Sequence, residues 1–102
     1  MSDLPANALR VVATIPTDPA HGDTVRAGLA DLVAATRQED GCLAYDAFES
    51  TEAPGTFVTV EAWTSQADLD AHMATPHIAT AFEVLGAALT GEVSIHPLAP
   101  LG

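Results

Sequence analysis

Four side chains that could do chemistry lie close together between residues 59 and 77: Glu61, Trp63, His72 and His77. A neutral imidazole can accept a phenolic proton, a carboxylate can accept a hydrogen bond from a hydroxyl group, and an indole ring can stack on a flat aromatic molecule. Three interpretations are open for this segment: a catalytic site, a metal site, or ordinary packing in a protein core.

Four short stretches rich in β-branched and apolar residues predict the strands that would position these side chains. The predicted strands cover residues 9–15, 42–49, 57–63 and 92–96. Pro16 and Pro97 are expected to end the first and the last of them. The segment 50–55 carries the proline and glycine of a hairpin loop, so the second and third strands should pair antiparallel.

A first helix is predicted between the first two strands, because apolar residues recur there at helical spacing. The repeating positions are Val25, Leu29, Leu32 and Val33, with Thr36 continuing the stripe. We expect Asp23 or Thr24 to cap the start of this helix and Gly41 to end it in a left-handed conformation.

A second helical region is predicted after the third strand and should be broken by Pro76. Its first part places His72 on the same face as Leu69 and Met73, so the imidazole should point inward. Its second part should begin at Pro76 and end at Gly91.

The order strand, helix, strand, strand, helix, strand predicts an α+β fold of the ferredoxin-like βαββαβ type, with a four-stranded antiparallel sheet and both helices on one face. The third strand carries Phe57 and Trp63 on one side and Val58 and Val60 on the other, so neither face suits water. The uncovered face is therefore predicted to pack against a second subunit in a homodimer. The chain is predicted to be a single domain over residues 1–102, with its core in 9–98.

The charge balance excludes two classes of partner. Three arginines, no lysine and fourteen acids give a formal net charge of -11. Nucleic acid and anionic membrane surfaces both require clusters of basic residues, so we expect neither as a partner. No leader or membrane-spanning run is predicted, and the single cysteine, Cys42, fits a cytoplasmic location. A small neutral molecule is the expected ligand.

Three motifs resemble the antibiotic biosynthesis monooxygenase (ABM) family, in particular its small members that are similar to quinol monooxygenases. They are "RQEDGCLAYD" (37–46), "FVTVEAWTSQADLDAH" (57–72) and "TPH" (75–77), and the resemblance extends from Leu9 to Leu98. It implies a dimeric α+β barrel in which each subunit keeps a pocket between its own sheet and helices. Some members of this family oxidise polycyclic phenols or hydroquinones with molecular oxygen and use neither metal nor flavin, while others degrade haem.

Two departures narrow what the resemblance implies. Haem-degrading members need a histidine late in the second helix, and residues 78–89 contain none, so haem degradation is disfavoured. Phenol-oxidising members combine a tryptophan with Asn, Tyr and Arg partners. Trp63 matches the tryptophan, but Thr59 and Leu69 stand where the Asn and the Tyr would be expected.

The two histidines are the candidate catalytic residues. His72 is either a general base facing a pocket or a core histidine bonded to the backbone. His77 follows Pro76 at a helix start, where the helix dipole disfavours the imidazolium; it is either a second base or a capping residue. Zinc motifs place two histidines at i and i+4 on one continuous helix, whereas these two are separated by a proline, so no metal ligand is predicted.

Trp63, Tyr45 and Glu61 are the candidate substrate-binding residues. Trp63 could stack on a flat substrate or pack in the core, and Tyr45 could donate a hydrogen bond to a quinone carbonyl or cover the dimer interface. Glu61 needs a partner if it is buried, which could be Arg10 or a ligand hydroxyl, with the internal ion pair favoured.

The predicted function is that of a cofactor-independent monooxygenase that oxidises a phenolic, hydroquinone or polyketide-type aromatic with molecular oxygen. Such substrates can reduce oxygen once deprotonated, so the protein would supply a dry pocket, orientation and a base. The alternative is a non-catalytic dimeric module that binds a small aromatic ligand.

Overall fold

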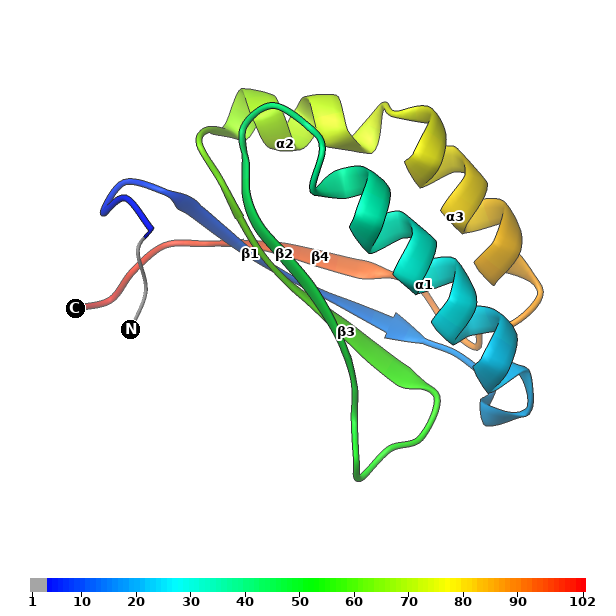
Figure 1. Ribbon diagram of the computed structural model, residues 1–102. Coiled ribbons are helices and arrows are strands. Elements are labelled where there is room, and N and C mark those ends of the chain that lie inside the picture. The colour runs from blue at the N-terminus through cyan, green and yellow to red at the C-terminus, as the bar shows by residue number, and fades with distance from the viewer. Residues whose placement is uncertain (1–3) are drawn as a thin grey trace.

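The fold follows the predicted element order with one added turn (Figure 1). It was obtained as a computed structural model that describes residues 4–102. The elements are β1 (Leu9–Pro16), a short 3₁₀ helix η1 (Pro19–His21), α1 (Gly22–Thr36), β2 (Cys42–Glu49), β3 (Thr56–Trp63), α2 (Gln66–Met73), α3 (Pro76–Gly86) and β4 (Ser94–Leu98).

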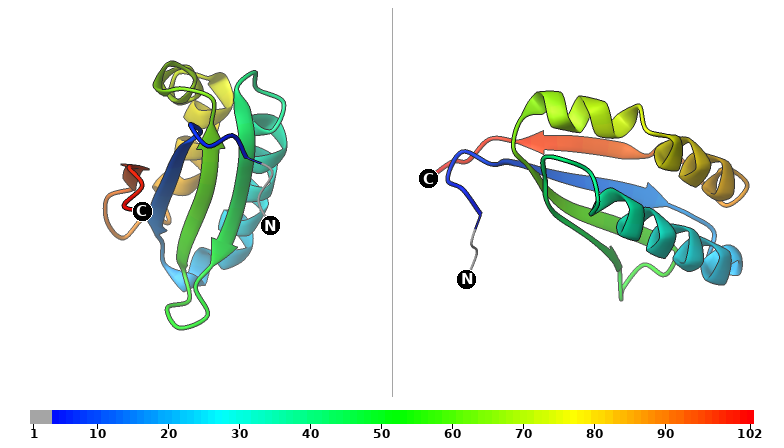
Figure 2. Two further views of the ribbon diagram at one scale, coloured as in Figure 1. Left: turned by 90° about the vertical axis from the view of Figure 1, so that its left-hand side faces the viewer. Right: turned by 45° about the horizontal axis from the view of Figure 1, so that its top comes forward.

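The four strands form one antiparallel sheet in the order β2-β3-β1-β4. The helices lie together on one face of this sheet, and the left view of Figure 2 shows the strands standing in front of them. The ferredoxin-like α+β fold is therefore confirmed. Residues 4–102 leave much of the other face exposed, with Val60 at 45% and Phe48 at 56% exposure.

Strand β3 shows why the two faces differ. Phe57, Thr59, Glu61 and Trp63 alternate along it and are all buried, since they lie under the helices. Val60 points to the other side and is 45% exposed. The alternation predicted for this strand is confirmed.

The start and the end of α1 differ from the sequence prediction. Asp18 caps the 3₁₀ turn by accepting a hydrogen bond from the Ala20 amide at 2.9 Å, and this turn runs directly into α1. The predicted caps, Asp23 and Thr24, therefore both lie inside the first helical turn. The helix ends at Thr36, and Gly41, with φ of 83°, turns the chain into β2 instead of capping the helix.

The break in the second helical region is confirmed. Ser65 caps α2 by accepting a hydrogen bond from the Asp68 amide, and Thr75 caps α3 in the same way, with Pro76 as its first residue. However, α3 ends at Gly86, so Gly91 does not close it.

Strand β4 lies two residues later than predicted, and Pro97 is part of it, paired with Val11. This proline is tolerated because β4 is an edge strand, where a missing N–H need not break the sheet. Among residues 4–102, no helix is long and apolar enough to cross a membrane.

Candidate active site

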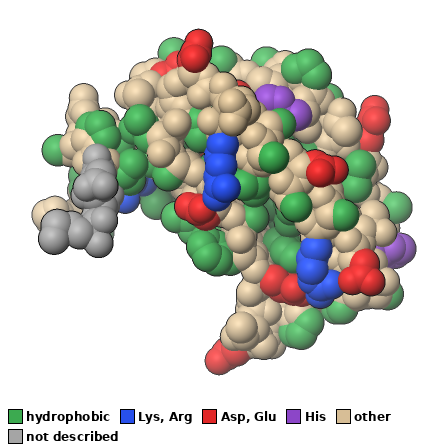
Figure 3. Space-filling view, in the orientation of Figure 1, with side chains coloured by type: hydrophobic (Ala, Val, Ile, Leu, Met, Phe, Trp, Pro, Cys, Tyr) green, Lys and Arg blue, Asp and Glu red, His purple; other side chains and the backbone are tan. Residues whose placement is uncertain are grey.

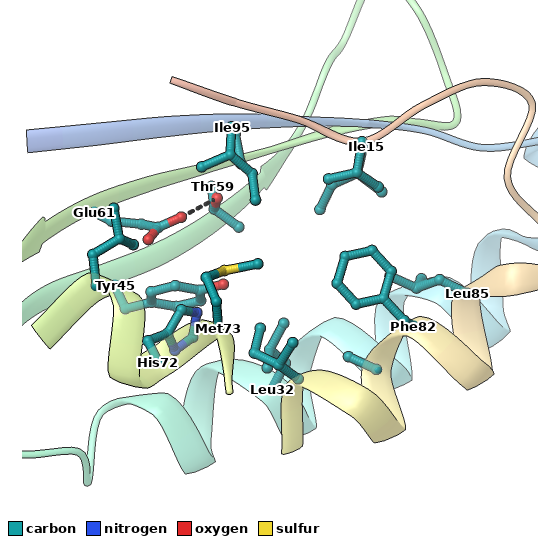
Figure 4. A pocket seen from close by; sticks show the side chains of 15 residues that line it. Ile15, Leu32, Tyr45, Thr59, Glu61, His72, Met73, Phe82, Leu85 and Ile95 are labelled. Atoms are coloured by element: carbon teal, nitrogen blue, oxygen red, sulfur yellow. Dashed lines mark hydrogen bonds between the residues drawn. The ribbon is translucent and has the colours of Figure 1, made fainter. Parts of the chain in front are cut away.

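A pocket lies between the inner face of the sheet and helices α2 and α3 (Figure 4). The cavity itself measures about 40 Å³, and the empty space reaches about 470 Å³ only when the open solvent at its mouth is included. Met73, Phe82 and Ile95 are the most exposed residues that line it, at 36 to 39% exposure, so they form its rim. None of the described lining residues is Lys or Arg. An apolar molecule without negative charge therefore fits this pocket best.

The polar part of the pocket comes from adjacent strands. Tyr45 of β2 pairs with Glu61 of β3, and Thr59 lies two residues from Glu61 on the same face. A bulge between Cys42 and Ala44 shifts the register of β2. Without the bulge, Cys42 and Tyr45 would face opposite sides of the sheet, because side chains alternate along a strand. The extra residue lets Cys42 pair with Trp63 while Tyr45 faces the helices.

Glu61 is buried and is held by two neutral donors. Thr59 Oγ1 donates to its Oε2 at 2.7 Å, which is the dashed line in Figure 4, and Trp63 Nε1 donates to its Oε1 at 3.0 Å. Arg10, the expected ion-pair partner, is exposed and lies opposite Ala62 on the other face of the sheet. The predicted ion pair is therefore wrong, and no salt bridge reaches Glu61 from any described residue.

Tyr45 is 4% exposed and lies edge-on to Trp63, with 6.4 Å between the ring centroids. Burial raises the pKa of Tyr45 well above its ordinary value, and the nearby Glu61 carboxylate raises it further. Both causes penalise the phenolate. The hydroxyl therefore stays protonated at neutral pH and can act as a hydrogen-bond donor.

His72 joins this group from α2 and is 2% exposed. Its ring lies 4.7 Å from Trp63 and 5.4 Å from Tyr45, measured between centroids. Its Nδ1 lies 2.6 Å from Oε2 of Glu39. His72 is thus packed between two aromatic rings and fixed by a carboxylate, and it lines the pocket.

His77 reaches the same oxygen from α3. Its Nε2 lies 2.7 Å from Glu39 Oε2, and its ring centroid is 6.1 Å from that of His72. The break at Pro76 places the two imidazoles around one point instead of separating them. Pro76 therefore does not keep the two histidines apart, contrary to the prediction. The ligand atoms of Glu39, His72 and His77 lie within 4.8 Å of one another, which makes them a possible metal-binding group.

Glu39 was not among the predicted site residues. Its loop is held by two backbone hydrogen bonds. The Glu39 amide donates to the Thr36 carbonyl at 3.0 Å, and the Cys42 amide donates to the Glu39 carbonyl at 3.2 Å. The next turn is docked by the Thr64 amide, which donates to the Gly41 carbonyl at 2.9 Å. These contacts aim the carboxylate at the helices.

The shared carboxylate determines which nitrogens carry protons when both rings are neutral. An ionised carboxylate can only accept hydrogen bonds, so His72 must carry its proton on Nδ1 and His77 on Nε2. His72 Nε2 is then a bare acceptor. A pocket histidine in this state can take a proton from a ligand hydroxyl.

The structure brings His72, Tyr45 and Glu61 together at the pocket, while the two other candidates lie outside its lining. Trp63 is fully buried behind the pocket and uses its N–H on Glu61. Its stacking on a substrate stays a prediction. His77 contacts Glu39 and lies beside the ring of His72, but it does not line the pocket itself.

Comparisons with known proteins identify the family and the fold of this chain. Residues 8–84 match the family described as "Antibiotic biosynthesis monooxygenase". The chain is 36% identical to "Putative monooxygenase Rv0793" of Mycobacterium tuberculosis across 89% of each chain, and the solved structure of Rv0793 superposes with a TM-score of 0.83 over 93% of this chain and 96% of that one. It is also 36% identical to "Probable quinol monooxygenase YgiN" of Escherichia coli, across 69% of this chain and 77% of that protein. A crystal structure described as an antibiotic biosynthesis monooxygenase superposes with a TM-score of 0.87 at 34% identity, over 92% of this chain and 99% of that chain.

Proposed function

The chain belongs to the antibiotic biosynthesis monooxygenase family, and from that premise we propose that its pocket oxidises a neutral phenol or hydroquinone with molecular oxygen, without metal or flavin in the reaction. The observation that carries this proposal is the bond from His72 Nδ1 to Glu39 at 2.6 Å, which leaves Nε2 as a base at the wall of an apolar pocket.

The chemistry needs one proton acceptor and little else from the protein. His72 Nε2 removes the phenolic proton, and the resulting imidazolium is stabilised by the Glu39 carboxylate on its other nitrogen. The electron-rich phenolate supplies the electrons that reduce oxygen. One oxygen atom enters the ring and the other leaves as water, so phenol and oxygen become quinone and water.

The remaining polar groups can orient the substrate. The Tyr45 hydroxyl stays protonated and can donate to a carbonyl that develops on the ring, because burial raises the pKa of its phenol. Glu61 can accept a hydrogen bond from a second hydroxyl group, which favours hydroquinones over simple phenols. The apolar lining would keep water from the reacting atoms.

The charge distribution supports a neutral substrate. The two arginines of the α1 region are already paired with carboxylates: Arg26 with Glu49 at 3.0 Å and Arg37 with Asp46 at 2.8 Å. Figure 3 shows the two prominent basic side chains of that face lying against acidic ones. With a net charge of -11, the protein would repel anionic substrates such as phosphorylated or carboxylated compounds.

We further propose that the active form is a cytoplasmic homodimer. The open sheet face carries Val12, Val58 and Val60, which the strand register places side by side, and Phe48 next to them is 56% exposed. An exposed apolar sheet face of this kind favours burial against an equal face of a second copy.

Oxygen uptake with a panel of hydroquinones, in the presence of a metal chelator, tests the reaction. His72→Ala should lower turnover by about 10²- to 10⁴-fold, which is the usual contribution of a positioned base. His77→Ala should cost about tenfold or less, because this ring lies outside the pocket lining and contacts Glu39 rather than the substrate. His21→Ala, at an exposed histidine that ends η1, is the control and should keep full activity.

Two results would overturn the proposal. Near-wild-type turnover by a folded His72→Ala variant would show that His72 is not the base. Loss of activity on chelation would show that the reaction needs a metal ion. Saturable binding of the hydroquinones without any oxygen uptake would instead support a module that binds small aromatics.

A further inference from the structure

We propose that Glu39, His72 and His77 form a binding site for one divalent transition-metal ion such as Zn²⁺, and that the bound ion blocks His72 as a base. The consequence for catalysis rests on the proposed function, whereas the binding of the ion does not. The three residues come from three separate parts of the fold: the α1–β2 loop, α2 and α3.

The geometry of the two imidazoles carries this proposal. His72 Nδ1 and His77 Nε2 both point at one position, 2.6 and 2.7 Å away, which the Glu39 oxygen now occupies. Zinc bonds to histidine nitrogen at about 2.0–2.1 Å and to carboxylate oxygen at about 2.0–2.2 Å. A small withdrawal of the carboxylate would let the ion take the shared position with all three ligands attached.

The ligand set and its surroundings suit the ion. Two imidazoles and one carboxylate are an established zinc ligand set that leaves a fourth position for water. The site is reachable from solvent, because the side chains of His77 and Glu39 are 26% and 13% exposed while that of His72 is 2% exposed. The strongly negative protein also attracts cations.

Metal binding would reverse the proton arrangement of His72. A metal ion can bind Nδ1 of His72 only if that nitrogen carries no proton. The neutral ring must then carry its proton on Nε2, the nitrogen that would otherwise accept the substrate proton. His77 likewise moves its proton from Nε2 to Nδ1. No proton leaves either ring, but His72 changes from an acceptor to a donor and can no longer deprotonate a phenol.

Calorimetric titration of metal-free protein with Zn²⁺ tests the site without any substrate. We expect one ion per chain for the wild type. The affinity for Zn²⁺ should fall by more than about tenfold in His77→Gln and in Glu39→Gln. Losing a residue that merely hydrogen-bonds to a metal ligand already costs about tenfold, and losing a ligand itself should cost more. His77→Gln is the safer variant for folding because its side chain is partly exposed.

Two controls separate this site from other zinc ligands in the chain. Cys42→Ser removes the only thiol of the sequence, and His21→Gln removes an exposed histidine at the end of η1; both variants should bind Zn²⁺ as the wild type does. An absence of saturable binding by the wild type, or equal affinity in His77→Gln, would overturn the metal site.

Nitrogen-15 NMR of the histidine rings tests the switch independently of turnover. The proton of His72 should lie on Nδ1 in the metal-free protein and on Nε2 when Zn²⁺ is saturating; a proton that stays on Nδ1 would refute the switch. If hydroquinone turnover is found, Zn²⁺ should abolish it at the concentrations that fill the site, and undiminished turnover would refute the block. If no turnover is found, the proposed function fails, and calorimetry and NMR still decide the metal site.

Discussion

Gly41→Ala is the substitution whose effect can be worked out most directly from the structure. Gly41 has φ of 83°, a region that L-residues rarely occupy. A Cβ placed there would lie 2.3 Å from Cγ, 2.5 Å from Oδ2 and 2.8 Å from Cβ of Asp68. Asp68 cannot simply turn away, because its carboxylate accepts from the Ser65 hydroxyl at 3.0 Å and its backbone belongs to α2.

Two costs add in this variant. The left-handed backbone costs about 1–2 kcal/mol for a residue with a side chain. Overpacking against Asp68 costs about 1–3 kcal/mol. The sum, about 2–5 kcal/mol in the free energy of unfolding, should lower Tm by at least about 8 °C in a domain of this size.

Thermal unfolding followed by circular dichroism measures this loss. Gly86→Ala is the matched control, because its added Cβ meets nothing within 4 Å and its position closes a helix. It should be neutral or stabilise by up to about 1 kcal/mol. Asp68→Ala combined with Gly41→Ala removes the two closest clashing atoms, so the cost of Gly41→Ala should be smaller in that background.

A Tm for Gly41→Ala within the error of the wild type would refute this reasoning. An equal cost of Gly41→Ala with and without Asp68 would show that the backbone conformation alone is responsible.

Three further predictions test the burial of single groups. Tyr45 is the only tyrosine, so phenolate absorbance reports its ionisation alone. In the folded protein Tyr45 should not ionise near the ordinary tyrosine pKa of about 10, because burial raises its pKa, and the free energy of unfolding should therefore fall as pH rises above about 10. Ionisation of the folded protein at the ordinary pKa would contradict the burial. Light scattering should show a dimer for the wild type and a monomer for Val60→Asp, since a charge on the open sheet face would be buried unpaired at the interface. A wild-type mass near 10.5 kDa at micromolar concentration would rule out the dimer. Burial raises the pKa of the Cys42 thiol, so iodoacetamide should alkylate the folded protein more slowly than the urea-unfolded protein at the same pH, and equal rates would show a freely ionising thiol.

The fold could be predicted because its elements leave local patterns. Alternation along β3 indicated which side chains point inward, and Thr75 followed by Pro76 marked the start of α3. The boundaries that were missed depend on the neighbours of each element. From the sequence alone, Pro97 predicts the end of a strand. The strand order shows that β4 lies at an edge of the sheet, where a proline is tolerated.

The site could be predicted only in part, for a similar reason. Periodicity predicted that His72 points inward, and this is confirmed by its burial. Glu39 lies 33 residues from His72 in the chain, so no spacing pattern connects them. The expected pairing of Glu61 with Arg10 failed because the register of β1 and β3 places Arg10 opposite Ala62, on the other face.

The proline in β4 also affects how copies of this protein can meet. An edge strand with a full set of free N–H and C=O groups invites another chain to extend the sheet. Pro97 lacks an N–H, so a strand added along β4 would lose a hydrogen bond at that residue. The other edge strand, β2, carries no proline, so edge-to-edge pairing could close a pair through β2, but growth into open-ended fibres would also need the β4 edge and is therefore disfavoured.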